Sequence, residues 1–550
     1  MFRLWAPGQP AMHLHCEGHA PVAMAKDDEG WFSLTAQAAP GSRYLFVLAD
    51  GQAVPDPAAR VQSGGVHGWS VVTLPLARQD TDWRGRPWEE AVIMEIHAGL
   101  YGGFRAVAQD LPRLAALGIT GIELMPVAAV SGTRNWGYDG VLPFAPAEAL
   151  GSPEDLRALV EAAHGLGLMV LLDVVYNHFG PDGNYLETYA PEFFHAEAMT
   201  PWGGAVAVDK APVASFFLEN ALMWLEEYGF DGLRFDAVHA IGNNAFLDGL
   251  AGKIRSQIAP GRHVHLILEN EHNDAARLTQ GRYDAQWNDD FHNVLHVLLT
   301  GETSAYYGDF ADDPAQRLAR CLSDGFIYQG EPSANQDGKP RGTASAHLPP
   351  TAFVTFLQNH DQIGNRALGE RLTLLTDASR LRAATALLLL CPQIPLMFMG
   401  DELGSRSPFL FFTDFHDDLA DIVREGRRKE FAKFDGFADE AARARIPDPN
   451  APDTFTRSRP QPGPDANLWE ALYRDLLTLR ARWIVPRLPG ARATGAQATG
   501  DKAVWATWRM GDGARLTLAI DLSEAPVAAQ APGTCLHAEG KRFSAWLDRA

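Results

Sequence analysis

Eight short apolar segments alternate with helical segments between residues 91 and 402, and this alternation limits the possible folds more than any other feature of the chain. The apolar segments are, in order, "AVIMEIHAG", "ITGIELMPV", "LMVLLDVVYNH", "FDGLRFDAV", "VHLILEN", "DAQWNDD", "FVTFLQNHD" and "IPLMFMGDE". The helical stretch "SPEDLRALVEAAHGLG" opens with Ser152 as a predicted N-cap, followed by Pro153. Strands that are apolar on both faces are typical of a parallel sheet covered by helices. We therefore expect an α/β fold, a (β/α)8 TIM barrel.

The two ends of the chain differ from this middle region. With 550 residues, the chain is longer than a single compact core usually is. Residues 1–88 contain short β-type runs such as "YLFVLAD" between turn sequences, which predicts an N-terminal β-sandwich. Residues 487–550 contain "AVWATWRM" and "ARLTLAIDL", which predict a small C-terminal β-domain. The barrel is then expected to occupy residues 89–486.

Charge and cysteine content argue against several classes of partner and site. The formal net charge of -21 and the pI of about 5.3 disfavour binding to nucleic acid or to anionic membranes. The four cysteines lack any CxxC pair, so neither a disulfide framework nor a zinc site is indicated.

The sequence predicts neither a secretory signal nor a membrane-spanning helix. The start, "MFRLWAPGQP", does not resemble a secretory signal. The apolar region "AATALLLLCPQIPLMFMG" is interrupted by Pro392, Gln393 and Pro395, which predicts a helix and a following strand instead of a membrane span. We expect a cytoplasmic protein with no nucleic-acid or membrane partner.

Polar side chains stand at the C-terminal ends of four predicted strands, where the active sites of such barrels lie. They are Asp173, Asn177 and His178 on the third strand, Arg234, Asp236 and His239 on the fourth, Glu269 on the fifth, and His360 and Asp361 on the seventh. Each could singly be a structural polar group, but together they predict one site at the mouth of the barrel.

Clustered carboxylates without a serine or cysteine motif favour glycoside hydrolysis. A retaining enzyme needs one carboxylate as nucleophile and a second, protonated one as acid and then base. Arg234 lies two residues before Asp236 on the same strand face, so it would keep that carboxylate ionised and oriented. Metal binding is the alternative use of such a cluster, but the chain has no HExxH or EF-hand motif. We therefore expect neither a metal nor a cofactor.

Four motifs, "DVVYNH", "GLRFDAVH", "LEN" and "FLQNHD", resemble the signature regions of the α-amylase superfamily, in that superfamily's order. The resemblance implies that Asp236 is the nucleophile, Glu269 the general acid/base and Asp361 the transition-state stabiliser. It also implies that Arg234, His178 and His360 bind the sugar at the cleavage subsite, and that the N-terminal sandwich is immunoglobulin-like, of the carbohydrate-binding-module type.

Narrower motifs, including "NWGYDGV", "YDAQWNDDFHNVLH", "YQGEPS" and "FLQNHDQIGNRALGERL", are similar to the maltooligosyltrehalose trehalohydrolase family. This implies cleavage of the α-1,4 bond next to the terminal trehalose of maltooligosyltrehalose, action on α-1,4-glucan substrates, and functional pairing with maltooligosyltrehalose synthase. A glycogen branching enzyme, a general α-amylase and a non-catalytic glucan-binding protein remain as alternatives.

Further side chains are expected to bind substrate. Tyr138, Trp202 and Trp287 stand in predicted strand-end loops, where flat rings can cover the apolar faces of sugars. Asp290, in "NDDF", is the candidate for the trehalose side. The remaining candidates are Asp139 and His239.

Two departures from the family pattern stand away from the catalytic carboxylates. One is Ala214, where the family tends to have an arginine. The other is "MGDEL", which places Asp401 and Leu403 where MGEEW is more usual. The loss of that tryptophan puts an aromatic sugar contact at this position in doubt.

Overall fold

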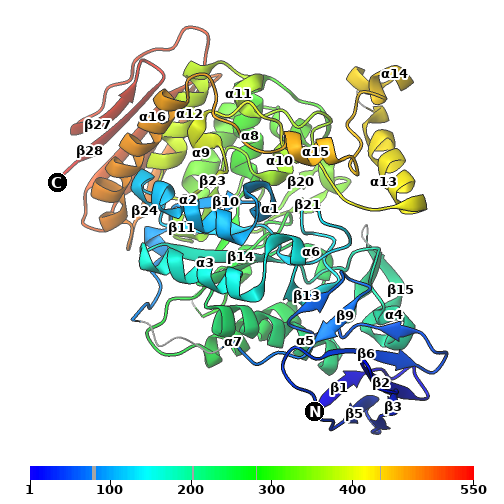
Figure 1. Ribbon diagram of the computed structural model, residues 1–550. Helices are drawn as coiled ribbons and strands as arrows, with labels where there is room; N and C mark the ends of the chain where they lie inside the picture. Colours follow the sequence, from blue (N-terminus) through cyan, green and yellow to red (C-terminus); the bar gives the residue numbers. More distant parts are fainter. Residues whose placement is uncertain (77–81, 201–202, 280, 434, 550) are drawn as a thin grey trace.

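The centre of the molecule is a closed barrel of parallel strands that follow one another in chain order. The computed structural model describes residues 1–76, 82–200, 203–279, 281–433 and 435–549 (Figure 1). The barrel strands are β10 (Ile93–Ile96), β11 (Gly121–Leu124), β14 (Met169–Val174), β17 (Gly232–Phe235), β18 (His265–Leu268), β19 (Ala285–Trp287), β22 (Phe353–Thr355) and β23 (Ile394–Phe398). Each of the eight predicted segments supplies one of them, so the predicted TIM barrel is confirmed.

The interior of this barrel is apolar except for charged side chains on four adjacent strands. Glu95 on β10 lies in register with Glu123 on β11, and Asp173 on β14 lies in register with Arg234 on β17. All four are at most 2 % exposed. Asp173 and Arg234 are hydrogen-bonded to each other, whereas burial raises the pKa of Glu123 well above its ordinary value.

Helices cover the outside of the barrel (Figure 1). The principal ones are α2 (Phe104–Leu117), α3 (Pro153–Gly165), α5 (Ala211–Leu222), α7 (Asn244–Gln257), α8 (Asp289–Thr300), α12 (Ala378–Leu390) and α16 (Ala466–Leu479). The predicted N-cap of α3 is confirmed, because the Ser152 hydroxyl accepts a 3.2 Å hydrogen bond from the amide of Asp155. No helix in the described part of the chain is long and apolar enough to cross a bilayer.

The N-terminal region forms two small antiparallel sheets that pack on each other through apolar side chains such as Leu14, Phe32 and Phe46. One sheet contains β1 (Phe2–Trp5), β5 (Trp31–Leu34) and β4 (Ala25–Lys26). The other contains β3 (Val22–Ala23), β2 (Met12–Cys16), β6 (Arg43–Leu48), β9 (Trp69–Val71) and β8 (Gln62–Ser63), with β7 (Ala53–Val54) paired to β6. The predicted N-terminal sandwich is therefore present.

The chain ends in a five-stranded antiparallel sheet on the side of the barrel away from the N-terminal sheets (Figure 1). Its strands are β24 (Arg492–Gly500), β25 (Ala503–Arg509), β26 (Arg515–Asp521), β28 (Phe543–Asp548) and β27 (Thr534–Glu539). It packs against α12 and α9 (Pro314–Asp324). The predicted C-terminal β-domain is present, and the boundaries after residues 88 and 486 stay predictions.

Long connections follow the C-terminal ends of several barrel strands. They contain β12 (Ala128–Ala129) and β13 (Leu142–Pro146) after β11, β15 (Phe194–Thr200) and β16 (Gly203–Val206) after β14, β20 (Glu331–Ser333) and β21 (Lys339–Arg341) after β19, and α13 (Asp417–Glu430), α14 (Glu440–Arg443) and α15 (Pro452–Arg457) after β23. These connections stand around the end of the barrel at which such folds place their active sites.

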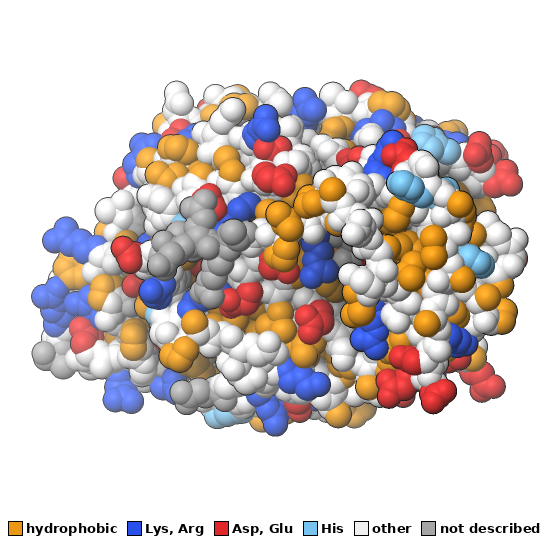
Figure 2. Space-filling view, turned by 60° about the horizontal axis from the view of Figure 1, so that its bottom comes forward, with side chains coloured by type: hydrophobic (Ala, Val, Ile, Leu, Met, Phe, Trp, Pro, Cys, Tyr) orange, Lys and Arg blue, Asp and Glu red, His pale blue; other side chains and the backbone are white. Residues whose placement is uncertain are grey.

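The net charge is not gathered into one patch on the face shown in Figure 2. Acidic and basic side chains are interspersed there with hydrophobic and uncharged ones. This face therefore shows no large patch of a single charge.

Candidate active site

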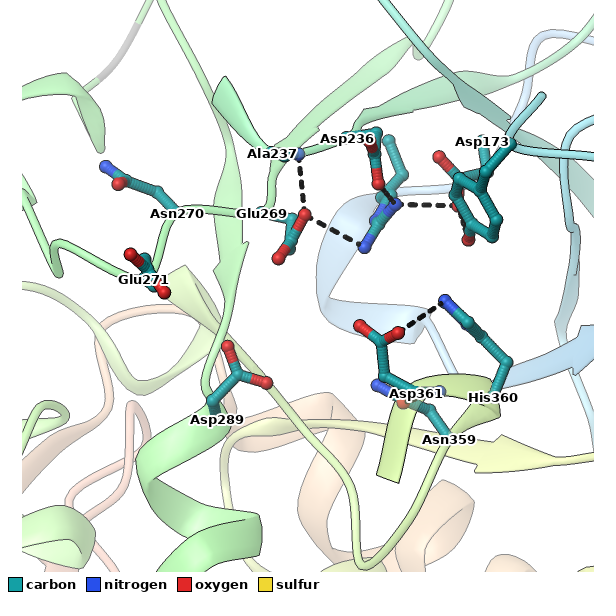
Figure 3. A network of polar contacts seen from close by, with 12 residues as sticks. Asp173, Asp236, Ala237, Glu269, Asn270, Glu271, Asp289, Asn359, His360 and Asp361 are labelled. Carbon is teal, nitrogen blue, oxygen red and sulfur yellow. Dashed lines mark hydrogen bonds and ion pairs between the residues drawn. The ribbon is translucent and has the colours of Figure 1, made fainter. Parts of the chain in front are cut away.

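The end of β17 supplies the first part of the site. Arg234 is fully buried, and its Nη1 donates to Asp236 Oδ1 at 2.8 Å and to Asp173 Oδ2 at 2.7 Å (Figure 3). The other carboxylate oxygen of Asp236 accepts a 2.8 Å hydrogen bond from Asn177 Nδ2. One contact comes from β17 and the other from the segment after β14, so the Asp236 carboxylate is held in one orientation.

Glu269, directly after β18, faces Asp236 across the same guanidinium. Its Oε2 lies 3.3 Å from Arg234 Nη2 and accepts a 2.6 Å hydrogen bond from the amide of Ala237 (Figure 3). Burial raises the pKa of Glu269 well above its ordinary value, and the negative charges of Asp236 and Asp361 add to this effect. Glu269 is therefore suited to hold a proton and to act as an acid.

The backbone conformation of Ala237 allows the hydrogen bond between its amide and Glu269. Its φ of 40° lies in the left-handed region, which costs an L-residue other than glycine on the order of 1 kcal/mol. In this conformation the Ala237 amide points at Glu269, one residue after Asp236. The strain therefore occurs where it connects the two candidate catalytic carboxyl groups.

The end of β22 places a third carboxylate. Asp361 follows Asn359, whose Oδ1 accepts a 2.9 Å hydrogen bond from the Asp361 amide. The Asp361 side chain is 41 % exposed, and its Oδ1 lies 3.5 Å from His360 Nε2. Although burial opposes a charge on His360, the carboxylates of Glu95 and Asp361 raise its pKa to about 9. His360 thus carries a positive charge beside Asp361 at neutral pH.

Tyr138 closes this side of the site. Its ring stacks on His360 with centroids 5.0 Å apart, and its hydroxyl donates to Asp173 Oδ2 at 2.6 Å. His178 lies nearby, with Nδ1 against Asn177 Oδ1, and burial lowers its pKa. Three of the predicted substrate-binding residues, Tyr138, His178 and His360, are thereby brought to the Asp236 side of the cleft.

Asp139 and His239 contact residues other than the three candidate catalytic carboxylates. Asp139 accepts a 2.7 Å hydrogen bond from Asn135 Nδ2, and burial raises its pKa. His239 Nε2 lies 3.7 Å from Glu271 Oε1, and burial lowers the pKa of this imidazole. Figure 3 shows Glu271 on the side of Glu269 away from Asp173. The predicted residue Trp202 lies outside the described residues.

Trp287 has a different role from the one expected. It is 1 % exposed, and the guanidinium carbon of Arg234 lies 4.1 Å from its ring centroid. The ring is therefore covered by Arg234 and offers no face to a sugar. The contact is a cation–π interaction, which helps to hold the guanidinium of Arg234 in place.

Asp290 is likewise not in the cleft. It is fully buried, and its Oδ2 accepts hydrogen bonds from Asn273 Nδ2 at 2.9 Å and from the Ile327 amide at 2.7 Å, while its Oδ1 lies 3.2 Å from Arg341 Nη2. The expectation of a direct sugar contact is wrong for this arrangement.

The preceding residue, Asp289, faces the site instead. Its carboxylate lies across from Glu269 and Asp361 (Figure 3), and Gln362 Nε2 donates to it at 3.4 Å. Burial, together with the charge of Asp361, raises the pKa of Asp289 to about 7. Successive residues on a helix point about 100° apart, so only one of the two aspartates at the start of α8 can face the cleft.

Asp290→Asn is expected to lower stability instead of removing a sugar contact. Loss of one partner leaves Arg341 buried and uncompensated, which costs about 3 kcal/mol or more. Thermal unfolding measures this loss of stability. Asp337→Asn is the matched control, because Asp337 is exposed between β20 and β21, the strand that carries Arg341, at a φ of 53°, which asparagine also adopts. Unchanged stability with lost cleavage would restore the direct role for Asp290.

Asp401, one of the departures from the family pattern, belongs to a buried contact set. It accepts a 2.7 Å hydrogen bond from Gln358 Nε2, and Arg371 Nη1 lies 3.3 Å away. Burial raises the pKa of Asp401 to about 7. These contacts hold the end of β23 in place, so Asp401 has a structural role.

The site as a whole combines three carboxyl groups on one guanidinium, those of Asp173, Asp236 and Glu269, with a fourth, Asp361, on the opposite wall and the aromatic ring of Tyr138. Burial raises the pKa of one of these carboxyl groups, Glu269. Retaining glycoside hydrolysis uses one carboxyl group as the acid and a second one as the nucleophile. Within the described ranges, no group of three or more His, Cys, Asp or Glu side chains is arranged as a metal site.

Comparisons with known proteins give consistent relatives. The family model "Alpha amylase, catalytic domain" matches residues 67–197, and "Domain of unknown function (DUF3459)" matches residues 491–546. The chain is 41 % identical to a malto-oligosyltrehalose trehalohydrolase of Deinococcus radiodurans, over 87 % of this chain and 80 % of the relative. It is 38 % identical to one from Rhizobium sp. (strain M-11), over 97 % of this chain and 93 % of the relative.

Solved structures agree on the fold. A crystal structure of a protein provisionally assigned as an alpha amylase, from Salmonella typhimurium, superposes with a TM-score of 0.94 at 45 % identity, covering 100 % of this chain and 97 % of the other. A pullulanase from Paenibacillus barengoltzii, at 18 % identity and a TM-score of 0.70, covering 100 % of this chain and 92 % of the other, shares the fold.

Proposed function

Because this chain belongs to the malto-oligosyltrehalose trehalohydrolase family, within the α-amylase superfamily, we propose that it hydrolyses the α-1,4 bond next to the terminal trehalose of maltooligosyltrehalose. The products are trehalose and a shortened maltooligosaccharide. The observation that carries the mechanism is that Asp236 and Glu269 flank one buried guanidinium, that of Arg234.

In the first step, the protonated Glu269 gives its proton to the glycosidic oxygen, and trehalose leaves. Asp236 Oδ attacks the anomeric carbon from the other side of the ring and forms a covalent glycosyl-enzyme. Asp361 stabilises the positive charge that develops at the ring. The raised pKa of Glu269 supports its role as the acid.

In the second step, the ionised Glu269 takes a proton from a water molecule, which attacks the anomeric carbon and releases Asp236. Two displacements at one carbon retain its configuration, so the freed maltooligosaccharide end is α. Tyr138, stacked on His360, supplies an aromatic surface for the sugar that is attacked.

The partners follow from this reaction. The substrates are maltooligosyltrehalose and related α-1,4-glucans, and a maltooligosyltrehalose synthase would supply the trehalose-capped chain. We place the reaction in the cytoplasm. All four cysteines are free, which is the usual state in a reducing compartment.

Capped chains are expected to be cleaved with a kcat/KM roughly tens- to thousands-fold higher than plain maltooligosaccharides with the same number of glucose units. The reason is that several hydrogen bonds to the trehalose end are made only by the capped substrate. Product chromatography measures both rates and identifies trehalose, and NMR of the fresh product reports the anomer.

The same incubations separate the alternatives. Equal cleavage of capped and plain chains would replace the proposal with a general amylase. New α-1,6 branch points on an α-1,4-glucan would identify a branching enzyme. Binding without turnover on every glucan would leave a non-catalytic glucan-binding protein.

A further inference from the structure

His360 lies between two carboxylates at the end of β22. On the side of the barrel interior, Glu95 on β10 accepts hydrogen bonds from His360 Nδ1 and, at 3.1 Å, from the His360 amide. On the side of the cleft, His360 Nε2 lies 3.5 Å from Asp361 Oδ1 (Figure 3). Glu95 and His360 are buried, whereas the Asp361 side chain is 41 % exposed. One imidazole ring therefore connects a buried carboxylate to the carboxylate on the wall of the cleft.

Aromatic rings hold this imidazole in place. The Tyr138 ring stacks on it with centroids 5.0 Å apart, and the Trp136 ring lies nearly perpendicular to it at 5.7 Å. Both ring nitrogens then have a fixed direction, Nδ1 toward Glu95 and Nε2 toward Asp361. Turning the imidazole would break its contact with Glu95.

The charge of His360 depends on the groups that surround the ring. The charged and titratable ones are Glu95 on β10 and His97 after it, Glu123 on β11, Tyr138 in the connection after β11, Arg234 on β17, and Asp361 on α10 (His360–Gly364). Burial and the charge of Arg234 lower the pKa of His360, but the carboxylates of Glu95 and Asp361 raise it, to about 9 in total. Because water screens the exposed Asp361 more than the buried Glu95, the positive charge of His360 depends mainly on Glu95.

Glu123 shows how a glutamate behaves in the same interior without a histidine beside it. Glu95 and Glu123 lie in register on adjacent strands, and both are buried. Among the described residues, neither carboxyl oxygen of Glu123 has a hydrogen-bond partner. Burial and the negative charges of Asp173 and Glu95 raise the pKa of Glu123 well above its ordinary value, which favours its uncharged form. Of these two neighbouring glutamates, only Glu95 contacts His360.

Resting on the proposed function, we propose that Glu95 is a positioning residue for the reaction, which acts through His360 to keep the imidazole doubly protonated and Asp361 directed into the cleft. The doubly protonated ring donates from Nδ1 to Glu95 and directs a charged N–H at Nε2 toward Asp361. A charged N–H attracts a carboxylate more strongly than a neutral one does. The exposed Asp361 side chain is thereby kept where it stabilises the positive charge that develops on the sugar.

The test compares the full-length variants Glu95→Gln and Glu123→Gln. Both changes replace a buried glutamate by a side chain of nearly the same shape, but only the first removes a partner of His360, so Glu123→Gln is the matched control. In Glu95→Gln, kcat for capped chains at neutral pH is expected to fall about ten- to hundredfold while KM stays within a few-fold of the wild type, because Asp361 acts in the transition state. Glu123→Gln should keep both constants close to those of the wild type.

Two further measurements separate positioning from a general structural effect. NMR of protein with isotope-labelled histidine reports the protonation of the His360 ring nitrogens, and His360→Asn identifies their signals. At neutral pH both nitrogens should be protonated in the wild type and in Glu123→Gln, whereas the ring should be uncharged in Glu95→Gln, because burial then outweighs the remaining carboxylate. The double variant Glu95→Gln/His360→Asn should be little slower than His360→Asn alone, because Glu95 acts through the imidazole.

The outcomes distinguish this proposal from the proposed function. A charged His360 in Glu95→Gln, equal losses of kcat in Glu95→Gln and Glu123→Gln, or fully additive effects of Glu95→Gln and His360→Asn would overturn the role of Glu95. Failure of the wild-type enzyme to cleave capped chains would overturn the proposed function, and the histidine spectra would still decide whether Glu95 keeps His360 charged. Melting temperatures identify a loss that comes from unfolding, and spectra recorded below the melting temperature then decide.

Discussion

Asp236→Asn is expected to lower turnover of capped chains by on the order of 10⁴-fold while leaving substrate binding within a few-fold of the wild type. The amide has the shape of the carboxylate but lacks the charge and the nucleophilic oxygen. Its oxygen can keep the contact with Arg234 Nη1, now at 2.8 Å. Its NH2 group would then face Asn177 Nδ2, also a donor, so Asn177 must rotate at a small cost in stability.

Single-turnover kinetics and a binding titration measure the two effects separately. Asp453→Asn is the matched control, because that aspartate is 76 % exposed on α15 and contacts only Arg457, at 3.7 Å, among the described residues. Near-wild-type turnover of Asp236→Asn would remove Asp236 as the nucleophile. Loss of binding in parallel with turnover would indicate that the variant disturbs the Arg234 network.

The barrel could be predicted from the sequence because its strands carry a signal that does not depend on distant residues. A strand packed between helices and the barrel interior is apolar on both faces, and the eight runs show this directly. Arg234 and Asp236 could be placed on one face because strand side chains alternate. The rule that active sites lie at the C-terminal ends of barrel strands then brought Glu269 and Asp361 to the same mouth.

Other features depend on contacts that no local pattern records. Asp289 and Asp290 are adjacent, and only the orientation of α8 decides that Asp289 faces the cleft while Asp290 pairs with Arg341. Trp287 looked like a sugar-binding ring, but Arg234 occupies its face. In both cases the partner comes from another part of the chain.

The excursion of the chain after β19 was less predictable than the barrel. Its place is set by contacts of Asp309, Arg341 and Glu271. The Pro-rich segment before α16 contains the short helix α15, and Pro452 occupies the first turn of this helix. Loops of this kind take their shape from tertiary contacts, so sequence periodicity carries little information about them.

The last prediction concerns Glu269→Gln, which should lower kcat/KM for capped chains by about 10²–10⁴-fold. Glutamine cannot give a proton to the departing trehalose. In the wild type, activity falls as the pH rises through the pKa of Glu269, because only the protonated form performs the first step, and burial places that fall at higher pH than for an ordinary glutamate. The Gln variant should lose this basic limb.

A glycosyl fluoride separates the role of Glu269 as an acid from its role as a base, because fluoride leaves without needing a proton. With this substrate Asp236 still attacks the anomeric carbon and fluoride departs, so the first step should recover much of its rate in Glu269→Gln. The second step still needs a base to activate water, and the glycosyl-enzyme should therefore accumulate. Intact-protein mass spectrometry should show one added glycosyl group, and peptide mapping should place it on Asp236. Equal losses on the fluoride and on the natural substrate, with no adduct, would show that Glu269 is not the acid, and an adduct elsewhere would move the nucleophile.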